Sequence, residues 1–293
     1  MRGKMIFAGL VVALSGSLAF AQEQQAPVPI DNDLYCSGIV TTESIPHDAY
    51  VITGEGSDHN IVFVQGEYVY IDRGSDQGVK VGDEFSVVRP LVDTVQIQWD
   101  KWQYSILHKM GTMWQDEGRV KVAVVERNTS IARISNSCNY IQRGDIILPF
   151  AERTPPPLKS EANFDQFAAP SGKDKAMIIV GKNFQQELGT NDIAYVNLGN
   201  HQGVRVGDYF RVFRYTGTQH ETVFQEPRFA FDVQGDWGPT YGFGAAPKKW
   251  DWTNTPREVL GEGIVLRTSP NASTVLLTFT LKTIYAGDYV EIE

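Results

Sequence analysis

An internal duplication constrains this chain more than any other feature. Residues 68–89, YVYIDRGSDQGVKVGDEFSVVR, match residues 193–214, IAYVNLGNHQGVRVGDYFRVFR, at a constant offset of 125. A fold built around the first string must therefore be built a second time around the other. In the numbering of the first copy, the recurring residues are Gly74, Gln77, Gly78, Val79, Val81, Gly82, Asp83, Phe85, Val87 and Arg89.

The similarity extends to both sides of the repeated string, in the same order along the chain. Each copy spans about 100 residues and carries an insertion of its own, which indicates a duplicated domain rather than a short tandem repeat. We expect the first domain over residues 34–150 and the second over residues 173–293. The further matching pairs are 49–54 with 176–181, 118–135 with 261–278, and 140–150 with 283–293.

Two polar, proline-containing segments flank the first copy. Residues 151–172, AERTPPPLKSEANFDQFAAPSG, contain three consecutive prolines, and such runs favour an extended backbone, so we expect a semi-rigid linker. Residues 22–33, QEQQAPVPIDND, are expected to form a flexible tail.

The residue pattern within each copy is typical of strands. Alternating β-branched and aromatic residues bounded by glycine recur, and no segment keeps a helical period. We predict an all-β fold of two tandem, homologous small barrels, closed or nearly closed, with an aromatic-rich insertion in each. Four Gly-Asp pairs predict tight turns in which glycine takes a positive φ and aspartate accepts hydrogen bonds from the following amides. These pairs are Gly82-Asp83, Gly144-Asp145, Gly207-Asp208 and Gly287-Asp288.

The N-terminus predicts export. Two basic residues precede a short apolar run, and Ala19-Phe20-Ala21 matches a cleavage site, so residues 1–21 are expected to be a secretory signal peptide. The apolar run is short for a membrane span, although an uncleaved anchor is the alternative. Cys36, the first cysteine, lies well beyond Ala21, which predicts no lipid anchor. The mature protein is therefore expected in the periplasm or outside the cell.

Net charge limits the classes of partner that this chain can bind, and the cysteine count limits its cross-links and metal sites. The formal net charge is −9, and the longest basic run is Lys248-Lys249, which disfavours binding to nucleic acid. The chain has two cysteines, Cys36 and Cys138, and an even count in an exported protein favours a disulfide. A metal site on two isolated cysteines lacks zinc spacing, so no metal and no cofactor are expected.

All six tryptophans fall in the matching insertions of the two copies. Glycine- and aromatic-rich loops on a rigid β scaffold are common positions for binding surfaces, and aromatic faces stack on sugars or on the apolar surface of a partner. The alternative is structural, with the tryptophans covering the barrel or the seam between the domains. The candidate binding residues are Trp99, Trp102, Trp114, Trp237, Tyr241, Trp250 and Trp252.

No catalytic residues are expected. The five histidines show no helical metal spacing and no recognisable nucleophile partner. His201 lies in the repeated string, but its counterpart is Asp76, which favours an exposed turn residue. The aspartates of the Gly-Asp pairs occupy equivalent turns of separate repeats, so they do not form the acid pair of a glycosidase. A calcium site at Asp58-His59-Asn60 is a weak alternative, because no calcium-loop spacing follows.

The string G-x-x-x-G-V-x-V-G-D-x-F-x-V-x-R, at residues 74–89 and 199–214, resembles the C-terminal β-domain of the periplasmic flagellar assembly protein T family. It is also similar to segments that accompany LysM domains in envelope proteins, and its Gly-Asp turns resemble those of small barrels with a GD box. The resemblance implies a non-catalytic module that supports assembly around the cell wall or outer membrane. Neither a LysM consensus nor another domain of the flagellar protein is apparent in the sequence, so a flagellar role is not carried over.

The expected function is therefore non-catalytic binding of an envelope protein through the aromatic loops. The alternatives are a module that binds peptidoglycan or another glycan, and an envelope enzyme with an unrecognised site. A shallow aromatic platform favours glycan, a flat apolar patch favours a protein, and an enclosed pocket with a perturbed titratable group favours an enzyme.

Overall fold

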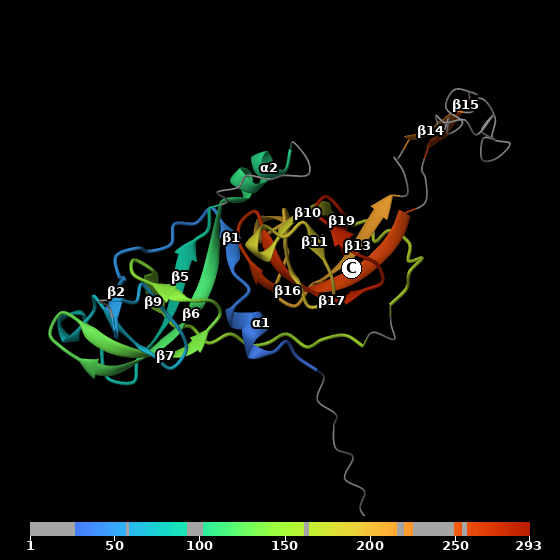
Figure 1. Cartoon of the computed structure of the whole chain (residues 1–293). Coiled ribbons are helices and arrows are strands. Elements are labelled where there is room, and N and C mark those ends of the chain that lie inside the picture. The colour runs from blue at the N-terminus through green and yellow to red at the C-terminus, as the bar shows by residue number, and fades with distance from the viewer. Residues whose placement is uncertain are drawn as a thin grey trace, which may run out of the picture.

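The computed structural model describes residues 27–56, 59–92, 102–160, 164–215, 220–224, 249–253 and 257–293, with the backbone alone described for 220–224 and 249–253. Two strand-rich halves lie side by side (Figure 1). The all-β expectation is confirmed: the first half is a curled sheet and the second is a closed barrel.

The first half is a sheet with the strand order β2-β4-β7-β6-β5-β9, and β1 also pairs with β6; we call it sheet 1. Hydrogen bonds from the backbone of Val51 to Asp145 and from Gly144 to Val51 link its two ends, so the sheet curls toward closure. Its elements are α1 (Asp31–Tyr35), β1 (Ile39–Thr41), β2 (Val51–Gly54), β3 (Val62–Phe63), β4 (Tyr68–Ile71), η1 (Ser75–Gln77), β5 (Glu84–Pro90), α2 (Gln103–Met110), β6 (Thr112–Val125), β7 (Ser130–Ser137), β8 (Ile141–Gln142) and β9 (Ile146–Pro149).

The second half is a closed barrel with the strand order β10-β12-β17-β16-β13-β19; we call it barrel 2. Pairing between β10 and β19 closes it, and β14 and β15 form a separate two-stranded pair in the second insertion. Its elements are β10 (Lys175–Gly181), η3 (Lys182–Phe184), β11 (Glu187–Leu188), β12 (Ile193–Val196), η4 (Asn200–Gln202), β13 (Tyr209–Tyr215), β14 (His220–Phe224), β15 (Lys249–Thr253), β16 (Arg257–Thr268), β17 (Ser273–Thr280), β18 (Ile284–Tyr285) and β19 (Tyr289–Ile292).

The two strand orders are the same once each strand is replaced by its counterpart in the repeat. The pairing register is also the same: Tyr70 lies opposite Ile131 in sheet 1, and the matching Tyr195 lies opposite Thr274 in barrel 2. Each half has an apolar interior, which contains Val69, Val87 and Val120 in sheet 1 and Phe210, Val212 and Leu277 in barrel 2. The duplication seen in the sequence is thus a duplication of topology.

The four Gly-Asp turns share one geometry. Each glycine has a positive φ, from 87° at Gly144 to 103° at Gly287, which glycine adopts without steric cost. Each aspartate accepts a hydrogen bond from the amide three residues before it, as Asp83 does from Lys80 at 2.9 Å. The prediction that the following amides donate is therefore wrong, because each carboxylate accepts from an amide that precedes it in the chain. The other three bonds run from Gln142 to Asp145, Arg205 to Asp208 and Tyr285 to Asp288.

Gly74 and Gly199 occupy matching positions in the two copies, and close backbone packing requires glycine there. A Cβ at Gly74 would lie 2.5 Å from the carbonyl oxygen of Glu126, and one at Gly199 would lie 2.2 Å from that of Ser269. The Gln77 side chain accepts a 2.9 Å hydrogen bond from the Gly74 amide, and Gln202 repeats this contact on Gly199. The recurrence of these residues therefore reflects one local fold.

The N-terminal segment joins the two halves. Residues 31–35 form α1, so the flexible tail expected to continue to Asp33 is helical where it ends. The predicted disulfide between Cys36 and Cys138 is formed, with the two Cα atoms 5.2 Å apart, and it fixes this segment to sheet 1. Figure 1 shows α1 and β1 between the halves. Leu34 and Val40 are buried there in an apolar cluster with residues of barrel 2.

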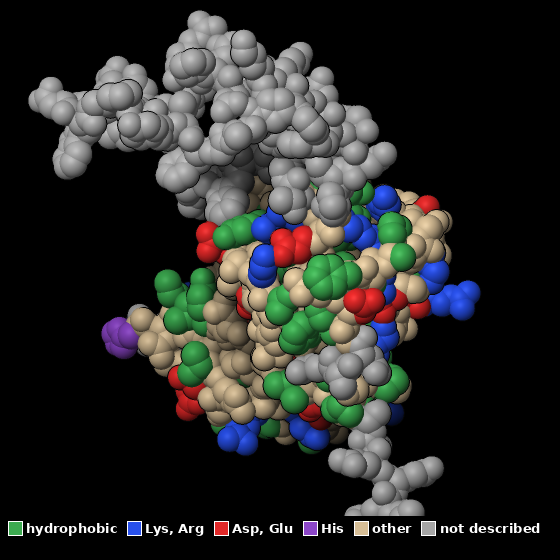
Figure 2. All heavy atoms as spheres, turned by 90° about the vertical axis from the view of Figure 1, so that its right-hand side faces the viewer, with side chains coloured by type: hydrophobic (Ala, Val, Ile, Leu, Met, Phe, Trp, Pro, Cys, Tyr) green, Lys and Arg blue, Asp and Glu red, His purple; other side chains and the backbone are tan. Residues whose placement is uncertain are grey.

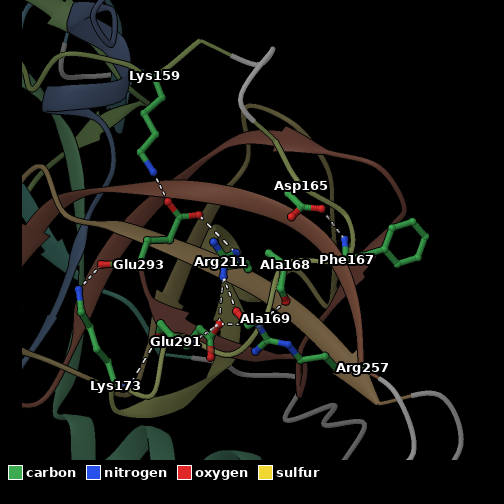
Figure 3. A network of polar contacts seen from close by, with 11 residues as sticks. Lys159, Asp165, Phe167, Ala168, Ala169, Lys173, Arg211, Arg257, Glu291 and Glu293 are labelled. Atoms are coloured by element: carbon green, nitrogen blue, oxygen red, sulfur yellow. Dashed lines mark hydrogen bonds and ion pairs between the residues drawn. The ribbon is translucent and has the colours of Figure 1, made fainter.

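The proline-rich segment contacts barrel 2 at Lys159 and again at Ala168 and Ala169 (Figure 3). Arg257 and Arg211 donate to the carbonyls of Ala168 and Ala169, at 2.9 and 3.2 Å. Lys159 pairs with Glu293, and its ammonium lies 4.2 Å from the centre of the Tyr209 ring. In the described residues this segment is therefore a strap on the barrel rather than a free spacer.

Charges of both signs are interspersed on the described surface. Figure 2 shows basic and acidic side chains alternating with apolar ones on the face turned to the viewer. Within the residues that the structure covers, no helix is long and apolar enough to cross a membrane.

Candidate functional site

Helix α2 belongs to the insertion of the first copy. The start of this helix lies at the seam, where the first half of the chain packs against barrel 2. Trp102 precedes the helix and packs, half-buried, against the cluster that also contains Leu107 and Met110. The Gln103 side chain donates to the carbonyl of Ile179 in barrel 2, at 2.7 Å. In this part of the chain the structure places Trp102 against the seam rather than on an open platform.

Trp114 lies in a different environment, near the start of β6. Its backbone is opposite Ile39 of β1 and Pro90 of β5, so two strands hold it in place. The ring is half-buried and lines a surface groove. Its Nε1 atom is buried and has no hydrogen-bond partner among the described residues, which costs free energy.

The groove beside Trp114 has a volume of about 670 Å³. One wall is the segment between β1 and β2, and the other is formed by the end of α2 and the start of β6. The groove offers an indole ring, a phenol ring and aliphatic side chains next to hydroxyls, imidazoles and one carboxylate. Its principal lining side chains are Glu43, Ile45, His47, Tyr50, His108 and Trp114.

Local hydrogen bonds order the wall between β1 and β2. The Thr41 hydroxyl oxygen accepts a 3.0 Å hydrogen bond from the Glu43 amide, and the Tyr50 hydroxyl donates to the carbonyl of His47. Gly111 allows the opposite wall to approach, because a Cβ there would lie 2.0 Å from the carbonyl oxygen of Thr41. The groove is therefore built into the fold, and its walls are held at a fixed separation.

The lining of the groove combines apolar faces with a few polar groups. Aromatic and aliphatic faces beside a few polar groups are the usual lining of a recognition site. Among the described residues, no group of three or more His, Cys, Asp or Glu side chains could hold a metal ion. Asp58, part of the weak calcium alternative, lies outside the described residues.

A second groove, of about 710 Å³, lies on sheet 1 beside the Asp83 turn. Its charged side chains include Asp48 and Arg73, which pair with each other at 2.7 Å. Glu84, also in its lining, pairs with Lys121 at 3.1 Å. Because these charges are already paired within the protein and no tryptophan lines this groove, the groove beside Trp114 is the stronger candidate.

The remaining predicted binding residues belong to parts of the chain that are less fully described. Trp250 and Trp252 lie on β15, opposite Val223 and Glu221 of β14. Trp99, Trp237 and Tyr241 lie outside the described residues. Of the predicted residues whose side chains the structure describes, Trp102 lies at the seam and Trp114 in the groove.

Sequence reasoning missed a buried ionic group in each half, which joins β5 to the turn before β9 and β13 to the turn before β19. Arg89 binds Asp145 through two hydrogen bonds, of 2.6 and 2.8 Å, and contacts buried Glu117 at 3.2 Å. Arg214 binds Asp288 in the same way in barrel 2. The signal was present in the sequence, because the arginine that ends the string and the second Gly-Asp pair both recur.

No family model matches the chain, and no characterised protein sequence matches it.

Proposed function

We propose that this protein is an exported, non-catalytic module of the cell envelope that binds a protein partner in the groove beside Trp114. The observation that carries the proposal is the groove itself, about 670 Å³ in volume and walled by Trp114, Tyr50 and Ile45. Its walls are ordered by backbone strands and local hydrogen bonds, and preorganised walls lower the entropic cost of binding.

A protein segment suits this lining. An extended chain can place an apolar side chain against the indole and phenol rings while its backbone meets the hydroxyls of the rim. Export is supported by the leader sequence and agrees with the disulfide at Cys36. The resemblance of the repeated string to envelope assembly modules supports the same assignment.

A glycan of the cell wall is the second candidate. Aromatic faces beside a carboxylate are the groups that stack on sugar rings and bind their hydroxyls, and Trp114, Tyr50 and Glu43 supply them here. The two candidates use the same groove, so they are separated by the probe, which is envelope protein extract in one test and peptidoglycan in the other.

Site-specific photo-cross-linking tests the protein partner. Benzoylphenylalanine replaces Thr112, which is exposed in the groove, in the mature chain 22–293, and envelope protein extract is the probe. The matched control carries the same group at exposed Val206 on barrel 2. We expect one discrete cross-linked protein at position 112, absent at position 206 and lost when Trp114→Ala is added. Identical bands at both positions, or none, would contradict the proposal.

Co-sedimentation with insoluble peptidoglycan tests the glycan. The blocking variant is Thr112→Arg, which fills the groove from an exposed position without removing a core side chain. Retention of the parent that this variant loses would assign the groove to glycan, provided that circular dichroism shows both proteins folded. Absence of retention would leave the protein partner.

A further inference from the structure

One outer face of barrel 2 is completely covered by the first half of the chain. The Tyr195 hydroxyl donates to the carbonyl of Ser37 at 2.8 Å, and the Thr274 hydroxyl donates to that of Gly38 at 3.2 Å. Helix α2 contacts the same face, where Gln103 reaches the carbonyl of Ile179. The residues that form this covered face are Ile179, Ile193, Tyr195, Thr274 and Leu276.

The duplication gives sheet 1 an equivalent face. Repeat offsets and strand register both match the residues of the covered face to Ile52, Tyr68, Tyr70, Ile131 and Arg133, which we call the open face. Its side chains point away from the interior, since Val51, Val69 and Ile71 between them are buried.

The two equivalent faces differ in exposure. Tyr70 is 38% exposed whereas Tyr195 is 2% exposed, and Ile52 is 44% exposed whereas Ile179 is fully buried. The apolar row continues across β6 to Val124, which lies opposite Ile131 and is also exposed. A contiguous row of exposed aromatic and branched side chains on a sheet is typical of an interaction surface.

The contact that covers barrel 2 within one copy indicates which kind of segment binds such a face. On barrel 2 the covering elements include α2, which belongs to the insertion of the first repeat. The matching insertion of the second repeat, residues 216–256, contains eight aromatic residues, five acidic residues and three basic residues. The open face carries exposed Arg133 beside Tyr68, whereas Lys121 on the adjacent strand is already paired with Glu84 at 3.1 Å. The guanidinium of Arg133 and the ring of Tyr68 are therefore complementary to an acidic, aromatic segment.

We propose that the open face is a docking surface for a second copy of this chain. The insertion of the second repeat of one copy covers the open face of the next, as the insertion of the first repeat covers barrel 2 within one copy. In Figure 1 strand β2 lies at the opposite end of the molecule from the ends of β13 and β16, between which that insertion runs. The contact therefore forms between copies, head to tail, and uses different patches on the two partners.

Sedimentation velocity of the mature chain 22–293 over a range of concentrations tests the association. The disrupting variant is Ile52→Lys with Tyr70→Lys, which places two charges on the open face. The matched control is Val206→Lys with Leu281→Lys, two exposed apolar positions of barrel 2 outside the covered face. We expect concentration-dependent association of the parent and the control, with the apparent Kd raised about ten-fold or more in the disrupting variant.

Cross-linking then identifies the contact. Benzoylphenylalanine replaces Tyr68, and isotopically labelled and unlabelled copies are mixed so that links between copies are distinguished from links within one copy. We expect links between copies that map to residues 216–256. The proposal is overturned if the parent is monomeric at every concentration, if the disrupting variant associates as the parent does, or if the links lie only outside 216–256 or within one copy. Circular dichroism confirms that the variants are folded.

Discussion

The hydroxyl of Tyr195 in barrel 2 donates a 2.8 Å hydrogen bond to the backbone carbonyl of Ser37 in the N-terminal segment. Burial raises the pKa of Tyr195, because a phenolate would lose its hydration in the seam, so the hydroxyl remains a donor. Tyr70 is the same residue at the same place in the repeat, and it is exposed. One repeated position thus joins the two halves in one copy and faces solvent in the other.

Substitution of Tyr195 by phenylalanine isolates the contribution of that hydrogen bond. We expect Tyr195→Phe to lower the free energy of unfolding by about 1–2 kcal/mol, because the buried carbonyl of Ser37 loses its donor. Tyr70→Phe is the matched control and should change the free energy by less than about 0.5 kcal/mol, as surface substitutions usually do. Urea unfolding followed by circular dichroism measures both. Equal effects at the two positions would show that the seam does not use this bond.

The aspartates of the Gly-Asp turns should differ in importance even though the turns share one geometry. Asp145 accepts from Gln142 and also pairs with Arg89, so Asp145→Ala leaves a largely buried guanidinium without its main partner. We expect a loss of about 3–5 kcal/mol in the free energy of unfolding. Asp83 makes the turn bond without such a pair, and Asp83→Ala should cost about 1 kcal/mol.

Chemical denaturation of these two variants and the parent gives the comparison. A cost for Asp83→Ala that matches that of Asp145→Ala would mean that the turn bond, and not the pair with Arg89, dominates. Asp208→Ala and Asp288→Ala repeat the comparison in barrel 2, where Arg214 takes the place of Arg89.

The sequence predicted the parts of the fold that depend on short-range patterns. Alternating apolar residues identified the strands, and the recurrence of the Gly-Asp pairs identified tight turns that both copies share. The duplication predicted that the two halves share one topology, whereas the strand order itself came from the structure. The cysteine count also predicted the bond between Cys36 and Cys138, because only one pairing is possible.

The contacts between the halves were not predictable in the same way. Tyr70 and Tyr195 are identical residues in matching strings, and no local pattern tells which of them is buried. The direction of the aspartate hydrogen bonds depends on turn geometry that the letters Gly-Asp do not specify. Trp102 and Trp114 lie in one insertion, yet Trp102 packs at the seam and Trp114 lines the groove. Packing of α2 against barrel 2 decides these positions.

Each half binds a cation between an aromatic ring and a carboxylate. The ring and the carboxylate have exchanged positions between the two repeats. In barrel 2, Lys159 of the strap lies over Tyr209 and pairs with Glu293. In sheet 1 the matching positions are Glu84 and Phe150, and Arg119 of the sheet itself lies 4.5 Å from the Phe150 ring centre and 3.6 Å from Glu84. At the position of Arg119, barrel 2 has the acidic Glu262. The cation over its ring is therefore Lys159 of the strap, which lies outside the barrel.

Removal of the disulfide should weaken both sheet 1 and the seam. The bond joins residues 102 positions apart, and a loop of that length implies a stabilisation of about 4 kcal/mol in the chain-entropy account. We expect Cys36→Ser with Cys138→Ser to lose about that amount and to become sensitive to proteolysis near α1. Thermal and urea unfolding with and without a phosphine reductant measure the effect. If the reductant destabilises the serine variant as much as the parent, the loss does not come from this bond.

The stability of the protein should fall as the pH rises toward neutrality, because buried Glu117 retains its proton in the folded state. Burial raises its pKa from 4.5 to about 7, and the opposing attraction of Arg89 is the smaller influence. Between about pH 4.5 and 7 the folded state therefore binds more protons than the unfolded chain, so its free energy of unfolding decreases with increasing pH in this window. Burial and Glu293 raise the pKa of Glu262 to about 7 as well, which adds a decrease of the same sign.

Glutamine at these positions stays neutral at every pH and should remove the corresponding decrease. We expect Glu117→Gln to reduce the loss of stability between pH 5 and pH 7.5 by about 1–3 kcal/mol, and Glu262→Gln to reduce it further when the two are combined. Urea unfolding at half-unit pH intervals measures the slope for the parent, each single variant and the double variant. A parent whose stability rises through this window, or a Glu117→Gln protein with the parent's slope, would show that Glu117 ionises in the folded state at its ordinary pKa.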